Sequence, residues 1–144
     1  MKALEKIVLH VDASEETQRA LRGVIRLSIL SGATIIAVHV VNRAVVTQMA
    51  RATGKSLAEV EVELEEDGWR YLYATEETAK SAGAHIVIVQ EQGYPEEVLP
   101  RLASEYGADI LALGAAARLR HDSIISRLIE QVIETTPCSV LVVK

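Results

Sequence analysis

The side chains best suited to chemistry in this 144-residue chain are its histidines, its single cysteine and an aspartate that follows an apolar run. They are His10, Asp12, His39, His85, His121 and Cys138. Three of the histidines lie within or beside hydrophobic runs, where packing or a backbone hydrogen bond is the commoner role, and no two have the i, i+4 spacing of a helical metal site. Cys138 has no second cysteine as a disulfide partner. The sequence therefore predicts neither a metal site nor a redox centre.

Motifs of the common enzyme classes are missing from the sequence. It contains no Walker A loop and no GxGxxG, HExxH, CxxC or GxSxG pattern. Asp12 follows an apolar run as the acidic residues of a phosphoacceptor receiver domain do. The run that ends at Val89 continues with Gln90, however, so the second carboxylate of a metal pocket is missing. Since no general base, carboxylate pair or supported nucleophile stands out, we do not expect an enzyme.

Strand-like and helix-like hydrophobic patterns alternate along the sequence, and they predict the elements that position these residues. Five apolar runs rich in β-branched residues are each, except the last, followed by a longer segment with helical periodicity, which is typical of a parallel sheet covered by helices. The predicted strands span residues 7–11, 34–40, 85–89, 109–113 and 139–143. Their nearly continuous hydrophobicity predicts burial on both faces. We therefore expect an α/β fold with an open five-stranded parallel sheet and helices on both faces.

Four helices are predicted between these strands. They run from after Asp12 to Gly32, from Lys55 or Ser56 to about Ser81, onward from Pro95, and from about Ser123 to Thr135. Asp12 or Ser14 can cap the first helix, and Gly32 suits its left-handed end. Five apolar residues of this helix are predicted to face the sheet: Leu21, Val24, Ile25, Leu27 and Leu30. Ligand-binding loops are then expected at the carboxyl ends of the strands.

Two segments before and within the second helix need interpretation. The connection from Asn42 to Gly54 is longer than usual, is predicted as a loop, and is a candidate cover for a binding site. The acidic run from Glu59 to Asp67 resembles a charged binding tail, but Leu57, Val60 and Leu64 cross it at the spacing of one helix face. A solvated helix face is therefore the preferred interpretation of the run.

The overall composition limits the class of protein. Hydrophobic residues make up 49% and charged residues 24%, and the net charge is −5. This charge argues against nonspecific nucleic-acid binding, which needs a basic surface. No run approaches the length of a membrane span, and the first residues lack the apolar region of a secretory signal. We expect a cytoplasmic protein that binds neither nucleic acid nor membrane.

The order of these pieces resembles the universal stress protein family. The segment 7–14 is similar to that family's first strand, which ends in an aspartate before a serine-capped helix. A His-Val pair at 39–40, a Gly-x-Pro turn at 93–95 and the last strand, 137–143, match further pieces in order and spacing. The resemblance covers residues 1–144 and implies a single domain with a Rossmann-like, adenine nucleotide alpha hydrolase-like fold.

The resemblance also points to a nucleotide site. Family members that bind ATP carry a loop of Gly, two residues, Gly, nine residues, Gly, then Ser or Thr. Its glycines let backbone N–H groups approach phosphate oxygens at a helix N-terminus. In this chain Gly114 fits the first position, Ala117 replaces the second glycine, and Ser126 and Arg127 stand where the last glycine and the Ser or Thr belong. Losing two or three charge-assisted contacts would weaken ATP binding by several powers of ten.

Two hypotheses for function follow from this resemblance. The first is a non-enzymatic stress-response or regulatory domain that binds ATP weakly or not at all and forms a homodimer through its last strand, 139–143, whose apolar edge favours pairing. The second is a module that binds ATP or AMP, in which the resemblance places Asp12 and Val40 on the adenosine. Basic side chains would then replace the glycines on the phosphates. These are Arg118, Arg120, His121 and Arg127.

Simpler roles for the same residues remain open. Asp12 and Ser14 are also explained as helix caps, Arg118 and Arg120 as solvated loop residues, and Gly114 as relief of crowding after a strand. A third hypothesis, in which the chain regulates a partner transporter or kinase as some relatives do, has no discriminating residue in the sequence.

Overall fold

Strands and helices alternate along the chain as the sequence predicts, except that two helices lie between the second and third strands. The structure is a computed structural model that describes residues 3–116 and 123–144. Its elements are β1 (Lys6–His10), α1 (Glu15–Ser31), β2 (Thr34–Asn42), α2 (Arg43–Thr53), α3 (Leu57–Ser81), β3 (Ile86–Gly93), α4 (Pro95–Tyr106), β4 (Ile110–Gly114), α5 (Ile124–Thr135) and β5 (Ser139–Val143). The strands are parallel and hydrogen-bond in the order β3-β2-β1-β4-β5. The predicted α/β fold is confirmed.

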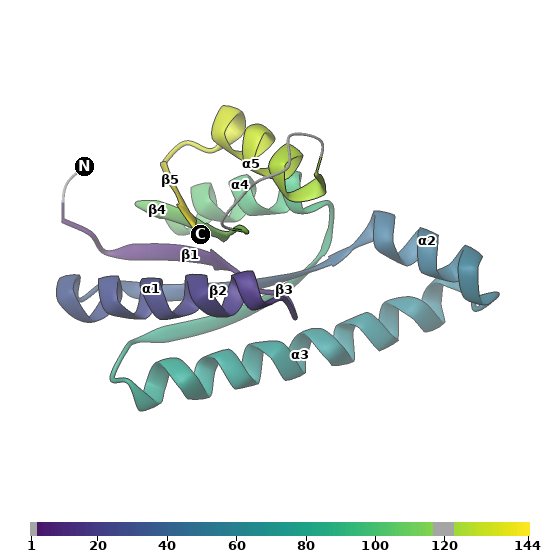
Figure 1. Cartoon of the computed structure of the whole chain (residues 1–144), viewed down its shortest axis with the longest axis horizontal. Helices are drawn as coiled ribbons and strands as arrows, with labels where there is room; N and C mark the ends of the chain where they lie inside the picture. Colours follow the sequence, from purple (N-terminus) through teal and green to yellow (C-terminus); the bar gives the residue numbers. More distant parts are fainter. Residues whose placement is uncertain (1–2, 117–122) are drawn as a thin grey trace.

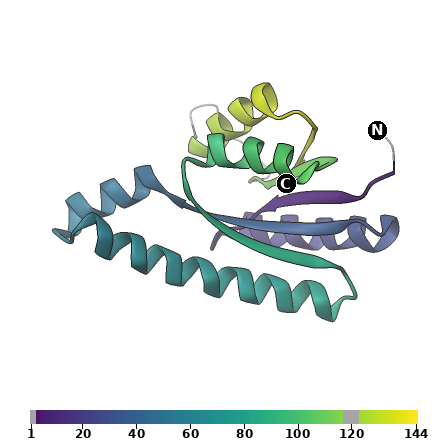
Figure 2. The same ribbon diagram turned by 180° about the vertical axis from the view of Figure 1, so that it is seen from behind.

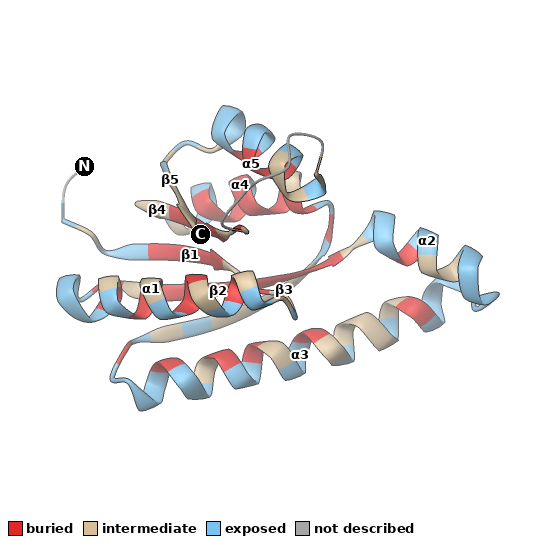
Figure 3. Cartoon of the chain, viewed as in Figure 1, coloured by how far each residue is buried: buried red, intermediate tan, exposed pale blue. Residues whose placement is uncertain are grey.

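Helices cover both faces of this sheet (Figures 1 and 2). One face packs against α1 and α3, and the other packs against α4 and α5. Ile7 and Leu9 of β1 enter the first core and Val8 enters the second, because neighbouring side chains of a strand point to opposite faces. Figure 3 shows the result: the middle of the sheet is buried, and the outward sides of the helices are exposed.

The strands differ in length and in burial. β2 and β3 continue together to Asn42 and Gly93, past the predicted ends at 40 and 89, whereas β1 ends at His10. The predicted burial on both faces holds for most of β1, β2 and β4. It is wrong for the two edge strands, β3 and β5, whose side chains are mostly only half-buried; Val87 of β3 is 47% exposed.

The predicted ends of α1 are confirmed, but one of its predicted core residues is not. Ser14 is the N-cap and accepts a hydrogen bond from the N–H of Thr17 at 3.2 Å, while Gly32 takes the left-handed conformation at the C-terminus. The prediction that Leu30 faces the sheet is wrong, since its side chain is 86% exposed. Six residues of helix place Leu30 about 120° around the axis from buried Val24.

The segment from Asn42 to Gly54 is a helix, so the loop prediction is wrong. The side chain of Asn42 accepts a hydrogen bond from the N–H of Ala44 at the start of α2, and Gly54 ends the helix in the left-handed conformation. A small apolar cluster holds α2 against α3 and the end of β2; it contains Val41, Val46, Met49, Ala50, Val60 and Leu64. The i, i+3, i+4 spacing of Val46, Met49 and Ala50 is the signal that indicates this helix.

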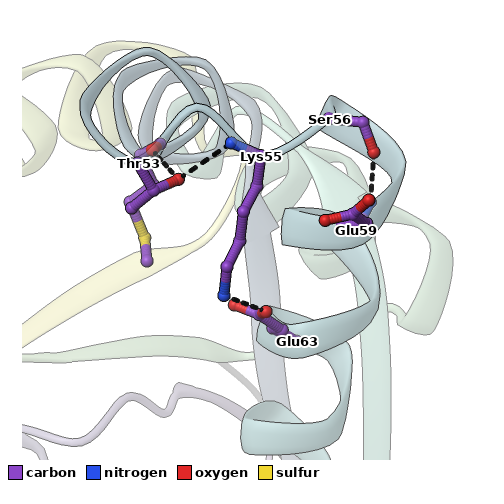
Figure 4. A network of polar contacts seen from close by, with 6 residues as sticks. Thr53, Lys55, Ser56, Glu59 and Glu63 are labelled. Carbon is purple, nitrogen blue, oxygen red and sulfur yellow. Dashed lines mark hydrogen bonds and ion pairs between the residues drawn. The ribbon is translucent and has the colours of Figure 1, made fainter.

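Polar contacts fix the turn between α2 and α3 (Figure 4). The Thr53 hydroxyl accepts a hydrogen bond from the N–H of Lys55 at 3.3 Å, and Lys55 Nζ lies 2.5 Å from Glu63 Oε1. Ser56 caps α3 by accepting a hydrogen bond from the N–H of Glu59, so the predicted start of this helix is confirmed. Across the described residues, no helix is both long and apolar enough to cross a membrane.

Candidate functional site

A cavity of about 560 Å³ opens at the carboxyl ends of β1 and β2. The strand order reverses around β1, which is where open parallel sheets bind ligands. The cavity is lined by residues of both helix layers and of the sheet: His10, Asp12, His39, Val40, Val41, Asn42, Val45, Leu64, Pro95, Glu96, Ile124, Ile125, Arg127, Leu128 and Gln131. Its wall is largely apolar, with a few polar groups, which is typical of a small-molecule site.

Asp12 is the carboxylate of this cavity, and it is held rigidly. Its Oδ1 atom accepts hydrogen bonds from the N–H of Ser14 at 2.8 Å, from the Ser14 hydroxyl at 2.5 Å and from the Thr17 hydroxyl at 2.6 Å. Burial alone would raise the pKa of Asp12, but these hydrogen bonds outweigh burial and hold the pKa below its ordinary value. The carboxylate is therefore charged at neutral pH, and its three bonds from protein groups all fall on one oxygen.

Val40 lies where β2 runs past the end of β1. The last register pair of these strands joins His10 to Val38, and the C=O of Val38 accepts a bond from Val11. Backbone groups alternate between the two sides of a strand, so the N–H and C=O of Val40 point to the same side as those of Val38. Within the described part of the chain, no backbone bond to Val40 exists on that side. A donor and an acceptor are thus left beside the cavity.

Two histidines of the cavity are uncharged at neutral pH. Burial lowers the pKa of His10, although the charge of Asp12 opposes the shift, and burial likewise lowers the pKa of His39. His39 is 8% exposed, and its Nδ1 lies 2.7 Å from Oε1 of Gln90. Because an amide oxygen only accepts hydrogen bonds, Nδ1 of His39 carries the proton.

The pair of His39 and Gln90 depends on a glycine within α3. Gln90 Nε2 donates to the backbone carbonyl of Glu65 at 3.1 Å, which joins β3 to α3. A Cβ atom on Gly68 would overlap both Gln90 Oε1 and His39 Nδ1, so any side chain at this position would have to displace the pair. The sequence carries a signal of this arrangement, a lone glycine in the middle of a long helical pattern.

The structure brings together some of the predicted site residues and separates others. Asp12, Val40 and Arg127 line the same cavity. Ser126 lies in the first turn of α5, where its N–H donates to the Ser123 hydroxyl at 3.1 Å, and it is not part of the cavity wall. Ala117, Arg118, Arg120 and His121 lie outside the described residues.

Gly114 has a packing role in the structure. It ends β4 next to the first turn of α1, where a Cβ atom would overlap the backbone carbonyl of Glu16. The close approach of β4 to α1 therefore explains this glycine without a phosphate. It does not line the cavity.

Sequence reasoning missed several cavity residues. Glu96 and Gln131 add polar groups from α4 and α5, and Val45 and Leu64 add apolar wall from α2 and α3. The residues of α5 recur at 124, 127, 128 and 131, the spacing of one helix face, but this pattern is the same for a core and for a cavity wall. The described residues contain no group of three histidine, cysteine or acidic side chains that could hold a metal ion.

A doubly wound parallel sheet with a cavity at its carboxyl edge defines a nucleotide-binding-like class of α/β protein. Within this class the chain belongs to the universal stress protein family, whose family model matches residues 3–144. The comparison with curated proteins gave no match to this chain.

Solved structures share the fold across the whole chain. The universal stress protein UspA from Lactobacillus plantarum has 17% identity and a TM-score of 0.82, with 100% of both chains covered. The universal stress protein from Archaeoglobus fulgidus in complex with dAMP has 18% identity and a TM-score of 0.71, again with 100% of both chains covered. A universal stress protein in complex with cAMP has 22% identity and a TM-score of 0.71, with 99% of this chain and 98% of that chain covered. At these identities the likeness concerns the fold.

Proposed function

We propose that the chain acts as one non-enzymatic universal stress protein domain that binds an adenine nucleotide mainly through its nucleoside part. The observation that carries this proposal is the convergence of Asp12, Val40 and Arg127 on one cavity. Binding of dAMP and of cAMP by the two relatives adds support for this class of ligand. Phosphates beyond the first would contribute little to the affinity.

The nucleoside part matches the groups around the cavity. A charged carboxylate is an acceptor, and the second oxygen of Asp12 suits a ribose hydroxyl. The unpaired N–H and C=O of Val40 suit an adenine edge, which offers an amino donor next to a ring-nitrogen acceptor. Apolar side chains such as Ile125 and Leu128 then cover the base.

The phosphate part has fewer partners among the described residues. Arg127 is exposed in the first turn of α5 and supplies one guanidinium that can hold a phosphate by its side chain. Gly114, the remaining glycine of the family's loop pattern, is accounted for by its contact with Glu16. Since the sequence has only one of the three glycines that family members use on the phosphates, we expect a triphosphate to gain little over a monophosphate.

Titration calorimetry of adenosine, AMP and ATP into protein stripped of ligand by unfolding and refolding tests this proposal. We expect the AMP and ATP affinities to agree within about threefold, and Asp12→Asn to weaken all three ligands because it removes the charge of the acceptor. ATP binding a hundredfold tighter than AMP would contradict the nucleoside-dominated site. No heat from any of the three at millimolar concentration would contradict nucleotide binding altogether.

The non-enzymatic part of the proposal needs its own measurement. The protein is incubated with ATP and magnesium, and ADP and AMP are quantified by chromatography. We expect no turnover above that of the Asp12→Asn protein, because Asp12 Oδ1 is already saturated by three donors and His10 is the only other titratable group near it on β1. Turnover that Asp12→Asn abolishes would instead assign a hydrolase.

A further inference from the structure

We propose that the outward side of α3 is a docking surface for a positively charged helix of a partner protein. The surface consists of five exposed residues, spaced by four, three, four and four positions along the helix: Val62, Glu66, Trp69, Tyr73 and Glu77. We call these residues the α3 strip. At 1.5 Å of rise per residue the strip is about 22 Å long, the length of a helix of about 15 residues.

The apolar part of the α3 strip is unusually open to solvent. Val62 is 52% exposed, Trp69 is 38% exposed and Tyr73 is 59% exposed. The rings of Trp69 and Tyr73 stack with their centres 5.8 Å apart at 28°, so they form one continuous aromatic face. The fold does not need them for packing on the sheet, since α3 buries a different set of side chains there: Val60, Gly68, Leu72, Thr75 and Ala79.

The charge of α3 is strongly one-sided. The helix contains eight acidic and two basic residues, a net charge of −6, whereas the whole chain carries −5. Both bases are paired within the helix, Arg70 with Asp67 and Lys80 with Glu76. Glu66 and Glu77, at the two ends of the aromatic face, take part in no ion pair within the described part of the chain.

These two properties together specify the chemistry of the partner. A stacked indole and phenol attract lysine and arginine side chains through their π faces, and flanking carboxylates add charge-assisted bonds. A solvated helix face accounts for the carboxylates but leaves the exposed aromatic pair unexplained. A helix with four basic residues at spacings of three or four, spanning eleven positions, would place its two end residues on Glu66 and Glu77 and its two middle residues on the rings.

A second copy of this chain is a less suitable occupant, although α1 carries exposed Arg22, Arg26, Ile29 and Leu30. The helices α1 and α3 cover the same face of the sheet (Figures 1 and 2). The exposed arginines of α1 lie four residues apart, about 6 Å along the helix, whereas Glu66 and Glu77 of the α3 strip lie about 16 Å apart. One α1 helix therefore meets the charge at only one end of the strip.

Fluorescence of Trp69 tests the proposal directly, because it is the only tryptophan in the sequence. The probe is a synthetic 16-residue helical peptide of alanine and leucine with lysines at i, i+4 spacing, and the matched probe has glutamates in place of the lysines. We expect the basic peptide to change the Trp69 emission saturably, with weaker binding at higher salt, and the acidic peptide to leave it unchanged. An unchanged emission with the basic peptide at millimolar concentration would overturn the proposal.

Two double variants with the same change in charge distinguish binding of the peptide at the α3 strip from its nonspecific electrostatic attraction to the protein. Glu66→Lys with Glu77→Lys should weaken the basic peptide by at least about tenfold. Glu105→Lys with Glu134→Lys makes the same charge change at exposed positions on α4 and α5 and should weaken it much less. Equal losses in both proteins would reduce the effect to nonspecific electrostatics and overturn the proposal.

Tyr73→Ala tests the aromatic face without removing the reporter. We expect about tenfold weaker binding of the basic peptide, and a protein that binds as tightly as the parent would reject the role of the aromatic face. The emission is also followed against protein concentration without peptide. A saturable shift, with growing mass in light scattering, would overturn the proposal in favour of self-association.

Discussion

The Nδ1 atom of His39 lies 2.7 Å from Oε1 of Gln90, and the two side chains fill the space into which a side chain on Gly68 would project. This contact brings together three elements, since His39 belongs to β2, Gln90 to the edge strand β3 and Gly68 to α3. Because of this close fit, replacing the helix glycine with alanine should lower the stability of the protein, whereas the same change usually raises the stability of a helix.

Replacing Gly68 with alanine should destabilise the protein by about 2 kcal/mol, because the added methyl group must displace the hydrogen-bonded pair of His39 and Gln90. In an open helix the same change stabilises by about 1 kcal/mol. Urea unfolding followed by circular dichroism measures the difference. Gly23→Ala in α1 is the matched control, since its Cβ would meet Val143 only at an ordinary contact distance of 3.7 Å. A stabilised Gly68→Ala protein would contradict the geometry of the pair.

Acid should weaken the fold through His39. Burial lowers the pKa of His39 below its ordinary value of 6.5, and the hydrogen bond that His39 donates to Gln90 opposes this only in part. The unfolded chain therefore takes up the proton first, so this contribution to stability is complete above pH 6.5 and is lost as the pH falls from there toward the folded-state pKa. Unfolding free energies measured between pH 7.5 and pH 5 should show this slope. His39→Gln should show a shallower one, and an identical slope would assign the effect to other groups such as His10.

Arg127 should contribute to the binding of the phosphate group and not to the binding of the nucleoside. Arg127→Ala is expected to weaken AMP by about tenfold and to leave adenosine unchanged, because one exposed charge-assisted contact is lost. Calorimetry of both ligands measures the effect. Arg22→Ala, which removes an exposed arginine from α1, is the control for the loss of positive charge. Equal weakening of adenosine would show that Arg127 acts on the shape of the cavity instead.

The edge strand β5 should carry a homodimer. Val140, Leu141, Val142 and Val143 are all only half-buried in one chain, and an apolar edge strand favours pairing with a second copy. Val142→Lys should give a monomer in light scattering with an unchanged circular dichroism spectrum. Val87→Lys on β3, the opposite edge of the sheet, should leave the dimer intact. A Val142→Lys protein that stays dimeric would exclude pairing through β5.

Local patterns allowed most of the fold to be predicted, because each depends on neighbouring residues. Runs of β-branched residues marked the five strands, and Ser14 and Gly32 marked the ends of α1. The loop prediction for residues 43–53 was wrong because the apolar spacing within this segment covers little more than one turn. Such a short pattern is decisive only once its packing partners, Val41 and Val60, are known. The prediction that Leu30 is buried was wrong for a similar reason, since several apolar faces of α1 fit the same helical period.

The candidate site was predictable only where chain position fixes space. Asp12 follows β1 and Val40 ends the predicted β2, so the parallel sheet itself brings them to one edge. The lone glycine in the helical pattern marks position 68, but its neighbours His39 and Gln90 are far away in the sequence, and no local pattern identifies them. The role of Gly114 depended likewise on Glu16, a residue of another element.

The unequal lengths of β1 and β2 have a consequence for how this chain tolerates change. The donor and acceptor at Val40 belong to the main chain, so any residue except proline that keeps β2 extended presents the same two groups. The hydrogen-bonding selectivity for a ligand at this point therefore depends on where β1 ends and not on which side chain occupies position 40. Substitution of Val40 can change the shape of the cavity while the backbone donor and acceptor stay in place. Extending β1 by two residues would instead pair these two groups, although no residue of the cavity wall on β2 would change.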